Sequence, residues 1–88
     1  MKSHKEFKPI LVLLGERIYH HRVLKNYTTK AIAPLLSLTP EAYRNIEKGE
    51  SDPSFTTLLL ITKVLELDCF ELIKSLELKS ISNNHEHK

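Results

Sequence analysis

The stretch that most constrains the fold is residues 28–49, which predicts two short helices joined by a tight turn. Thr28 is a favourable N-cap, because its hydroxyl can accept a hydrogen bond from the first turn of a helix. Apolar residues then recur at the spacing of one helix face: Ala31, Ile32, Leu35 and Leu36. Ser37 and Leu38 form the turn, so the first of the two helices is expected at residues 28–36.

The second helix of this stretch carries its own start and stop signals. Thr39 repeats the N-cap, and Pro40 occupies the first helical position, where a missing N–H leaves no hydrogen bond unmade. Gly49 ends the helix, because glycine readily adopts the left-handed conformation that follows many helices. Two short helices with a tight turn are the layout of a helix-turn-helix, whose second helix enters the major groove of DNA.

The rest of the chain predicts three more helices. The first begins at Pro9 and contains Gly15, which allows a neighbour to approach closely; the fourth spans residues 54–65. The fifth starts at Asp68, which can form a capping box with Glu71. We expect the inner faces of these helices to carry the following residues: Leu11, Leu14, Ile18 and Val23; Phe55, Leu58, Ile61 and Leu65; Leu72, Ile73 and Leu76.

These elements predict one all-α domain, a compact bundle of five helices with the helix-turn-helix at the second and third. The chain has 88 residues, enough for a single small core. We expect a flexible basic tail at residues 1–8, the domain at 9–80 with the motif at 28–48, and a flexible C-terminal tail at 81–88.

Composition excludes several classes of protein. Hydrophobic residues make up 41% and charged residues 27%, which is typical of a globular chain. No apolar run approaches the roughly 20 residues that cross a bilayer. The N-terminus lacks the apolar core of a signal peptide, so we expect a cytoplasmic protein without a membrane partner. Cys69 is the single cysteine and cannot form an internal disulfide.

Charge is distributed unevenly along the chain, although the net charge is only +2. Residues 1–49 contain nine Lys and Arg against four acidic residues, a net +5, whereas residues 50–88 contain four against seven, a net −3. A basic half that contains the motif suits a protein that meets phosphate on one side. A chance imbalance in a small domain is the alternative, so charge alone does not decide the function.

No set of side chains supports catalysis or metal binding. Catalysis needs a nucleophile, a base or a metal held in a pocket, and a core this small rarely spares one. His20 and His21 are adjacent, so on a helix they point in different directions and cannot share a metal ion. We therefore expect no enzyme activity, no cofactor and no metal.

Five features follow one another along the chain: LGERIYHHR at 14–22, the small Ala33, TPEAYRNIEKGES at 39–51, PSFTTLLLITKVLEL at 53–67 and DCFEL at 68–72. In this order they resemble the phage-repressor and Cro-type helix-turn-helix family, also called the XRE family. The resemblance covers residues 14–72 and implies a lambda-repressor-like fold with double-stranded DNA as the partner.

The resemblance places base reading on the helix at residues 40–48. Polar residues share one face of this helix: Pro40, Glu41, Arg44, Asn45 and Lys48. By resemblance, Glu41, Arg44 and Asn45 match the family's base-reading positions, and Pro40 is a further candidate for base reading. Arg44 could pair with guanine, Asn45 with adenine, and Glu41 could accept a hydrogen bond from cytosine. A solvated helix face without a ligand is the alternative interpretation.

Backbone phosphates would be contacted by residues that flank the two motif helices. Thr29, Thr39 and Lys48 match phosphate-binding positions of the family, and Lys30 is a further candidate. Simple helix capping is the alternative role for both threonines.

The resemblance also implies one structural ion pair, between Arg22 and Glu47. This pair would link the first helix to the end of the second motif helix and fix the angle at which that helix is presented. Removing one partner should cost more than breaking a surface pair, because the other charge stays partly buried.

Three residues depart from the family's pattern. Pro34 removes a hydrogen bond inside the first motif helix and should kink or shorten it. Ser37 stands at a turn position usually given to glycine, so it must accept a left-handed conformation or reshape the turn. Glu41 places an acid where the potential of DNA is negative, which lowers general affinity.

An excess of apolar residues in the last two helices suggests self-association. The candidate interface residues are Leu60, Val64, Leu78 and Ile81. Members of the family typically dimerise and bind two half-sites. Isolated apolar residues at the surface are the alternative, and they are common.

Two functions from different classes follow. The first is a homodimeric, sequence-specific transcriptional regulator, most simply a repressor, that binds an inverted-repeat operator through the helix at 40–48. The second is an antitoxin-like module that neutralises a partner protein, with DNA binding secondary.

Overall fold

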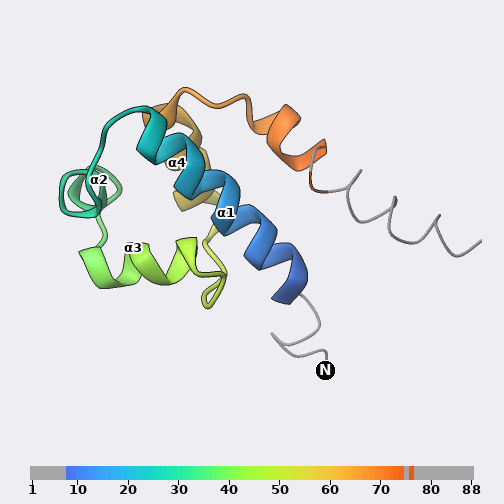
Figure 1. Cartoon of the computed structure of the whole chain (residues 1–88), viewed down its shortest axis with the longest axis horizontal. Coiled ribbons are helices and arrows are strands. Elements are labelled where there is room, and N and C mark those ends of the chain that lie inside the picture. Colours follow the sequence, from blue (N-terminus) through green and yellow to red (C-terminus); the bar gives the residue numbers. More distant parts are fainter. Residues whose placement is uncertain (1–7, 75, 77–88) are drawn as a thin grey trace, which may run out of the picture.

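The computed structural model describes residues 8–74 and 76. Its helices are α1 (Lys8–Leu24), α2 (Thr29–Leu35), α3 (Pro40–Glu47), α4 (Phe55–Leu65) and a fifth helix at residues 69–74 (Figure 1). No strand occurs among the described residues, which confirms the predicted all-α fold of five helices. None of the described helices combines the length and the hydropathy that crossing a bilayer requires.

Four of the helices begin at a side-chain cap, and the sequence predicts three of these caps: Thr28, Thr39 and Asp68. The side-chain hydroxyls of Thr28, Thr39 and Ser54 each accept a hydrogen bond of 3.1 Å from the backbone N–H three residues later. Asp68 Oδ1 likewise accepts from the backbone N–H of Glu71 at 3.3 Å. Each bond satisfies a donor that the first turn of a helix leaves without an intrahelical partner.

A single residue with a positive φ angle follows each labelled helix: Asn26 at 64°, Ser37 at 58°, Gly49 at 75° and Glu66 at 58°. Ser37 therefore takes the left-handed conformation that the turn was expected to demand, at a cost of roughly 1–2 kcal/mol for a residue with a β-carbon. Pro34 lies inside α2, which is only seven residues long.

The core is built from the inner faces of all five helices. Ile18, Ile32, Ala33, Tyr43 and Ile61 are all 0% exposed. Leu72 and Leu76 join the same cluster and attach the last helix to the bundle. The interior is thus continuous from α1 to the end of the described chain.

Three residues expected in the core lie at the surface instead: Val23, Phe55 and Ile73, which are 47%, 68% and 47% exposed. Val23 follows Ile18 by five residues, about 140° around the helix, and Arg22 takes the inward position. Phe55 precedes Ile61 by six residues. Three residues fall about 60° short of a full helical turn, so Phe55 is turned about 120° away from Ile61 and the inner face. Ile73 is one residue beyond Leu72 and is therefore turned about 100° from it.

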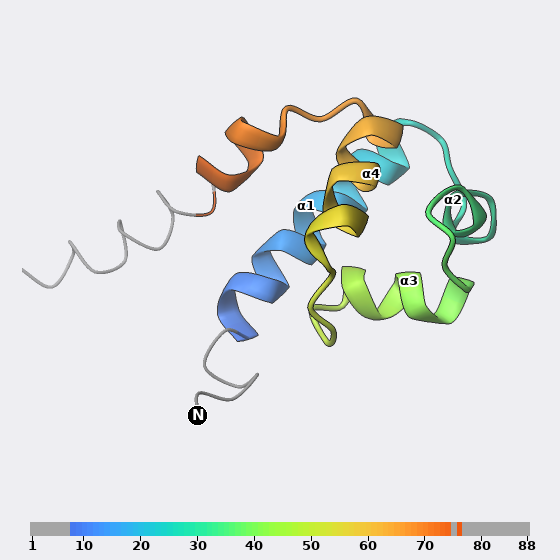
Figure 2. The ribbon, with the colours of Figure 1, turned by 180° about the vertical axis from the view of Figure 1, so that it is seen from behind.

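Helix α1 contacts both α3 and α4, and α2 contacts α3 (Figure 2). The approach of α1 to α3 is close, because a β-carbon on Gly15 would lie 2.2 Å from the backbone oxygen of Glu47. A β-carbon on Gly49 would lie 2.7 Å from the Cα of Val12. Lys8, the first residue of α1, donates from Nζ to the carbonyl of Gly49 at 2.9 Å. The first half of α1 therefore rests on the end of α3.

Candidate nucleic-acid interface

Helix α3 has one buried side and one side at the surface. Tyr43 and Ile46 point into the core and are 0% and 5% exposed. The residues expected to read bases all reach the surface to some degree: Glu41 and Arg44 are exposed, and Pro40 and Asn45 are half-buried. The polar face of α3 is thus the one turned away from the bundle.

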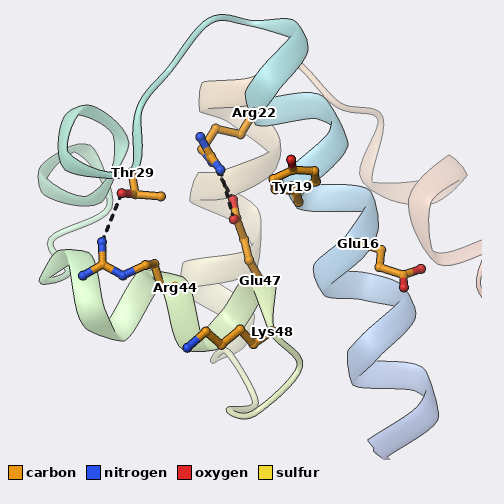
Figure 3. Close-up of a pocket in the computed structure, with 7 residues that line it drawn as sticks. All are labelled: Glu16, Tyr19, Arg22, Thr29, Arg44, Glu47 and Lys48. Carbon is orange, nitrogen blue, oxygen red and sulfur yellow. Dashed lines mark hydrogen bonds and ion pairs between the residues drawn. The ribbon is translucent and has the colours of Figure 1, made fainter.

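The residues expected to contact phosphate flank this face. Thr39 Oγ1 caps α3 by accepting from the N–H of Ala42. Thr29, at the start of α2, is half-buried, and its Oγ1 accepts a hydrogen bond of 3.2 Å from Nη1 of Arg44 (Figure 3). Lys30 and Lys48 are exposed. The structure therefore brings Thr29 and Arg44 together, although sequence reasoning treated them separately.

Arg22 and Glu47 form an ion pair between α1 and the last residue of α3. Arg22 Nε lies 2.7 Å from Glu47 Oε2, and Nη2 lies 3.3 Å from Oε1. The two side chains are only 12% and 9% exposed. Arg22 Nη1 also donates to the backbone oxygen of Tyr27 at 2.8 Å, so this one guanidinium joins α1, the α1–α2 turn and α3.

The hydroxyl of Tyr43 donates to the same carboxylate of Glu47. Burial raises the pKa of the Tyr43 phenol well above its ordinary value, and the hydrogen bond to Glu47 raises it further. The hydrogen bond to Glu47 likewise raises the pKa of Arg22. Both carboxylate oxygens of Glu47 are therefore occupied by donors that stay protonated at neutral pH.

Tyr19 lies beside Arg22 of this ion pair and is 52% exposed. The Arg22 guanidinium carbon lies 5.4 Å from the centre of the Tyr19 ring, within the range of a cation–π contact. Sequence reasoning missed this role of Tyr19. Its spacing of three residues before Arg22 on a helix is the signal that could have found it, because such residues are neighbours on the helix surface.

A pocket of about 260 Å³ lies between α1, α2 and α3, beside the polar face of α3 (Figure 3). Seven residues line it: Glu16, Tyr19, Arg22, Thr29, Arg44, Glu47 and Lys48. Its floor contains the Arg22–Glu47 pair, and its rim contains the cations Arg44 and Lys48. The pocket connects the buried ion pair to the exposed side of α3.

A helix-turn-helix family model matches residues 18–72, more than half of the chain. The chain belongs to the XRE-type helix-turn-helix family. Members of this family are DNA-binding regulators. Among curated protein sequences, none matches this chain.

Two solved structures share the XRE-type fold of this chain. The restriction-modification controller protein C.AhdI from Aeromonas hydrophila superposes with a TM-score of 0.69 at 24% identity, covering 75% of this chain and 96% of its own. The clp gene regulator ClgR from Corynebacterium glutamicum superposes with a TM-score of 0.71 at 17% identity, covering 89% and 87%. At these identities the likeness establishes the fold.

The apolar residues considered for self-association of this XRE-type domain differ in exposure. Leu60 and Val64 are half-buried and pack against the core, and Leu78 and Ile81 lie outside the described residues. More apolar surface is presented by residues that the sequence placed inside or did not single out: Phe55 at 68%, Leu59 at 38%, Phe70 at 70% and Ile73 at 47%.

Among residues 8–74 and 76, no three His, Cys, Asp or Glu side chains are grouped so that they could hold a metal ion. Cys69 is half-buried near the start of the fifth helix.

Proposed function

We propose that this protein is a sequence-specific transcriptional regulator that inserts α3 into the major groove of DNA. The observation that carries the proposal is the two-sided character of α3: Tyr43 and Ile46 anchor it in the core, while its polar side faces solvent. Membership of the XRE-type family supports DNA as the partner. The proposal includes a homodimer on an inverted-repeat operator, acting most simply as a repressor by occlusion.

Base reading is assigned to the residues on the open side of α3. Glu41 and Asn45 are four residues apart and lie on one stripe, so both can reach the floor of the same groove. Asn45 would pair with the N6 and N7 atoms of adenine, and Glu41 would accept from N4 of cytosine. Pro40 lies at the start of α3 and can make only apolar contacts. The fourth candidate, Arg44, turns toward Thr29.

Phosphate contacts are assigned to groups on either side of α3. Thr29 and Lys30 at the start of α2, together with Lys48 at the end of α3, would meet one stretch of backbone, and Thr39 would meet the backbone at the start of α3. Such contacts set the register of the protein on DNA but carry no sequence information directly.

Two observations support a regulator that acts as a dimer. The proteins that share its fold are described as a controller protein and a gene regulator. The apolar side chains of Phe55, Leu59, Phe70 and Ile73 are exposed, and a second copy would cover such surface together with Leu60, Val64, Leu78 and Ile81. A two-fold dimer requires a palindromic site, since each half-site meets one α3.

Selection of bound duplexes from a random pool at near-physiological salt tests the proposal. The expected result is enrichment of an inverted repeat with half-sites about one helical turn apart. Enrichment of a single half-site would support sequence-specific binding but contradict the proposed homodimer. Weak, salt-sensitive binding without enrichment would contradict the proposal. If a stable complex with another protein then forms, the antitoxin-like alternative gains support.

A further inference from the structure

Arg44 stands on the exposed side of α3, but its guanidinium does not extend away from the protein. Nη1 donates to Thr29 Oγ1 at 3.2 Å, which turns the side chain sideways across the gap between α3 and α2 (Figure 3). We propose that Arg44 binds a phosphate of the DNA backbone together with Thr29 and Lys48, and does not read a base. This inference rests on the proposed function and changes the role of one residue within it.

Helix geometry separates Arg44 from the base-reading stripe. Successive residues of an α-helix are turned by about 100°, whereas residues four apart lie nearly above one another. Relative to Glu41, Asn45 is turned by about 40° in one direction, and Lys48 and Arg44 are turned by about 20° and 60° in the other. When Glu41 and Asn45 face the groove floor, Arg44 is therefore turned toward one wall, where the sugar-phosphate backbone runs.

Three residues with hydrogen-bond donors in their side chains line one pocket. Thr29, Arg44 and Lys48 all line the hollow of about 260 Å³, which is large enough for a phosphate group. A guanidinium has five N–H donors, and the bond to Thr29 uses one of them, so a fork remains for two phosphate oxygens. The Thr29 hydroxyl, which accepts from Arg44, can at the same time donate its own hydrogen to a phosphate oxygen.

The carboxylates that line the same pocket do not oppose an anion there. Glu47 already accepts hydrogen bonds from Arg22 and Tyr43, and its charge is balanced by the guanidinium 2.7 Å away. The carboxylate of Glu16 points away from Arg44 and Lys48 (Figure 3). An anion at this pocket would therefore meet the positive charges of Arg44 and Lys48 among its lining residues.

Different residues of α3 would then contact the DNA backbone and the bases. Arg44 would fix the register of the protein on the backbone, and discrimination between bases would fall on Glu41 and Asn45. A phosphate contact contributes equally on every sequence and responds to salt, because it displaces condensed counterions. A guanine contact would instead be lost selectively at one base pair.

The test uses the full chain and the duplex selected from the random pool, together with duplexes that differ from it at single base pairs. Dissociation constants are measured across a series of salt concentrations for wild type, Arg44→Met and Thr29→Val. We expect Arg44→Met to weaken binding to every duplex by about tenfold and to reduce the salt slope by about one. Thr29→Val should cause a smaller and equally uniform loss.

Two control variants make the result specific. Lys63→Met removes one positive charge from α4 and should leave both the affinity ratios and the salt slope unchanged. Because Lys63 neighbours the proposed dimer residues Leu60 and Val64, sedimentation velocity first checks that this variant keeps the oligomeric state of the wild type. Asn45→Ala should relax discrimination at one base pair and leave the slope nearly unchanged. Thermal unfolding of each variant shows whether the domain remains folded, and Arg44→Lys, which keeps the charge, should retain most of the slope.

The outcomes separate this inference from the proposed function. If wild type selects a sequence and Arg44→Met loses preference at one base pair, Arg44 reads a base and the inference is wrong, while the proposed function stands. The same holds if Arg44→Met leaves affinity unchanged. If wild type selects no sequence, the proposed function fails, and the inference fails with it.

Discussion

Two ion pairs join the C-terminal end of α1 to the end of a later helix, one from Arg22 within α1 and one from Lys25 directly after it, and they differ in burial. Arg22 and Glu47, at the end of α3, are 12% and 9% exposed, whereas Lys25 and Glu66, after α4, are 38% and 74% exposed. The first pair is bidentate and shares its carboxylate with Tyr43. Exposed pairs contribute little to stability, because water and salt compete for both charges. The comparison indicates that α1 holds the orientation of α3 firmly and that of the α4 end weakly.

The largest effect is expected at the buried pair. Glu47→Gln leaves the Arg22 guanidinium without a counter-charge and should reduce the free energy of unfolding by about 3 kcal/mol, because the remaining charge stays desolvated. Urea denaturation measures this loss. A double-mutant cycle with Arg22→Met isolates the coupling between the two side chains. A loss as small as that of an exposed pair would remove the distinction between the two ion pairs.

The close approach of α1 to α3 is tested next. Gly15→Ala places a β-carbon 2.2 Å from the backbone oxygen of Glu47, so one helix must shift. Such overpacking should cost about 2 kcal/mol, even though alanine favours a helix more than glycine does. Thermal unfolding shows whether the variant is less or more stable than the wild type. Increased stability after Gly15→Ala would show that the spacing of α1 and α3 is adjustable.

The exposed pair should be dispensable. Glu66→Gly deletes the carboxylate that contacts Lys25, but it also relieves a left-handed backbone with a φ angle of 58°. Because glycine adopts this conformation without steric cost, we expect a small increase in the melting temperature. Glu66→Gln, which removes the charge and keeps the strain, is the matched control and should change little. A clear decrease in the melting temperature of both variants would show that this exposed pair stabilises the fold as much as the buried pair does.

The smallest expected effect is the pH dependence of stability that His21 contributes, on the side of α1 near the end of α4. Burial lowers the pKa of His21, and the nearby charges of His20 and Arg17 lower it further. The unfolded chain therefore binds this proton more readily, so stability is complete above about pH 7 and falls as the pH drops through the ordinary histidine pKa of about 6.5 toward the folded value.

His21→Gln removes this titration and should reduce the difference in melting temperature between about pH 7.5 and pH 5.5. The acidic residues Glu66, Asp68 and Glu71 line the same pocket as His21 and are unchanged in the variant. An identical acid-dependent decrease in wild type and variant would exclude His21 as a contributor.

The helices could be predicted from the sequence, because caps and turn residues depend only on neighbours within a few positions. The caps Thr28 and Thr39 and the left-handed Ser37 needed only their neighbours in sequence. The wrong core assignments, Val23 and Phe55, came from extending an apolar pattern past the point where steps of three or five residues leave the inner face.

The site could be predicted only in part. The face of α3 followed from helical periodicity, whereas the pairing of Arg22 with Glu47, 25 residues apart, was available only from the family resemblance. The hydrogen bond from Arg44 to Thr29 depends on how α2 crosses α3, and no spacing in the sequence determines that crossing. Side chains that meet across elements therefore required the structure.

The shortness of the two motif helices has a consequence for how the binding surface forms. Helix α2 has seven residues and α3 has eight, and isolated helices shorter than about 12 residues are unstable in water. Both helices therefore depend on the core beneath them and should melt with it in one cooperative step. Amide protons of α3 should then exchange with solvent mainly through global opening, so the protein would present its binding surface in full or not at all.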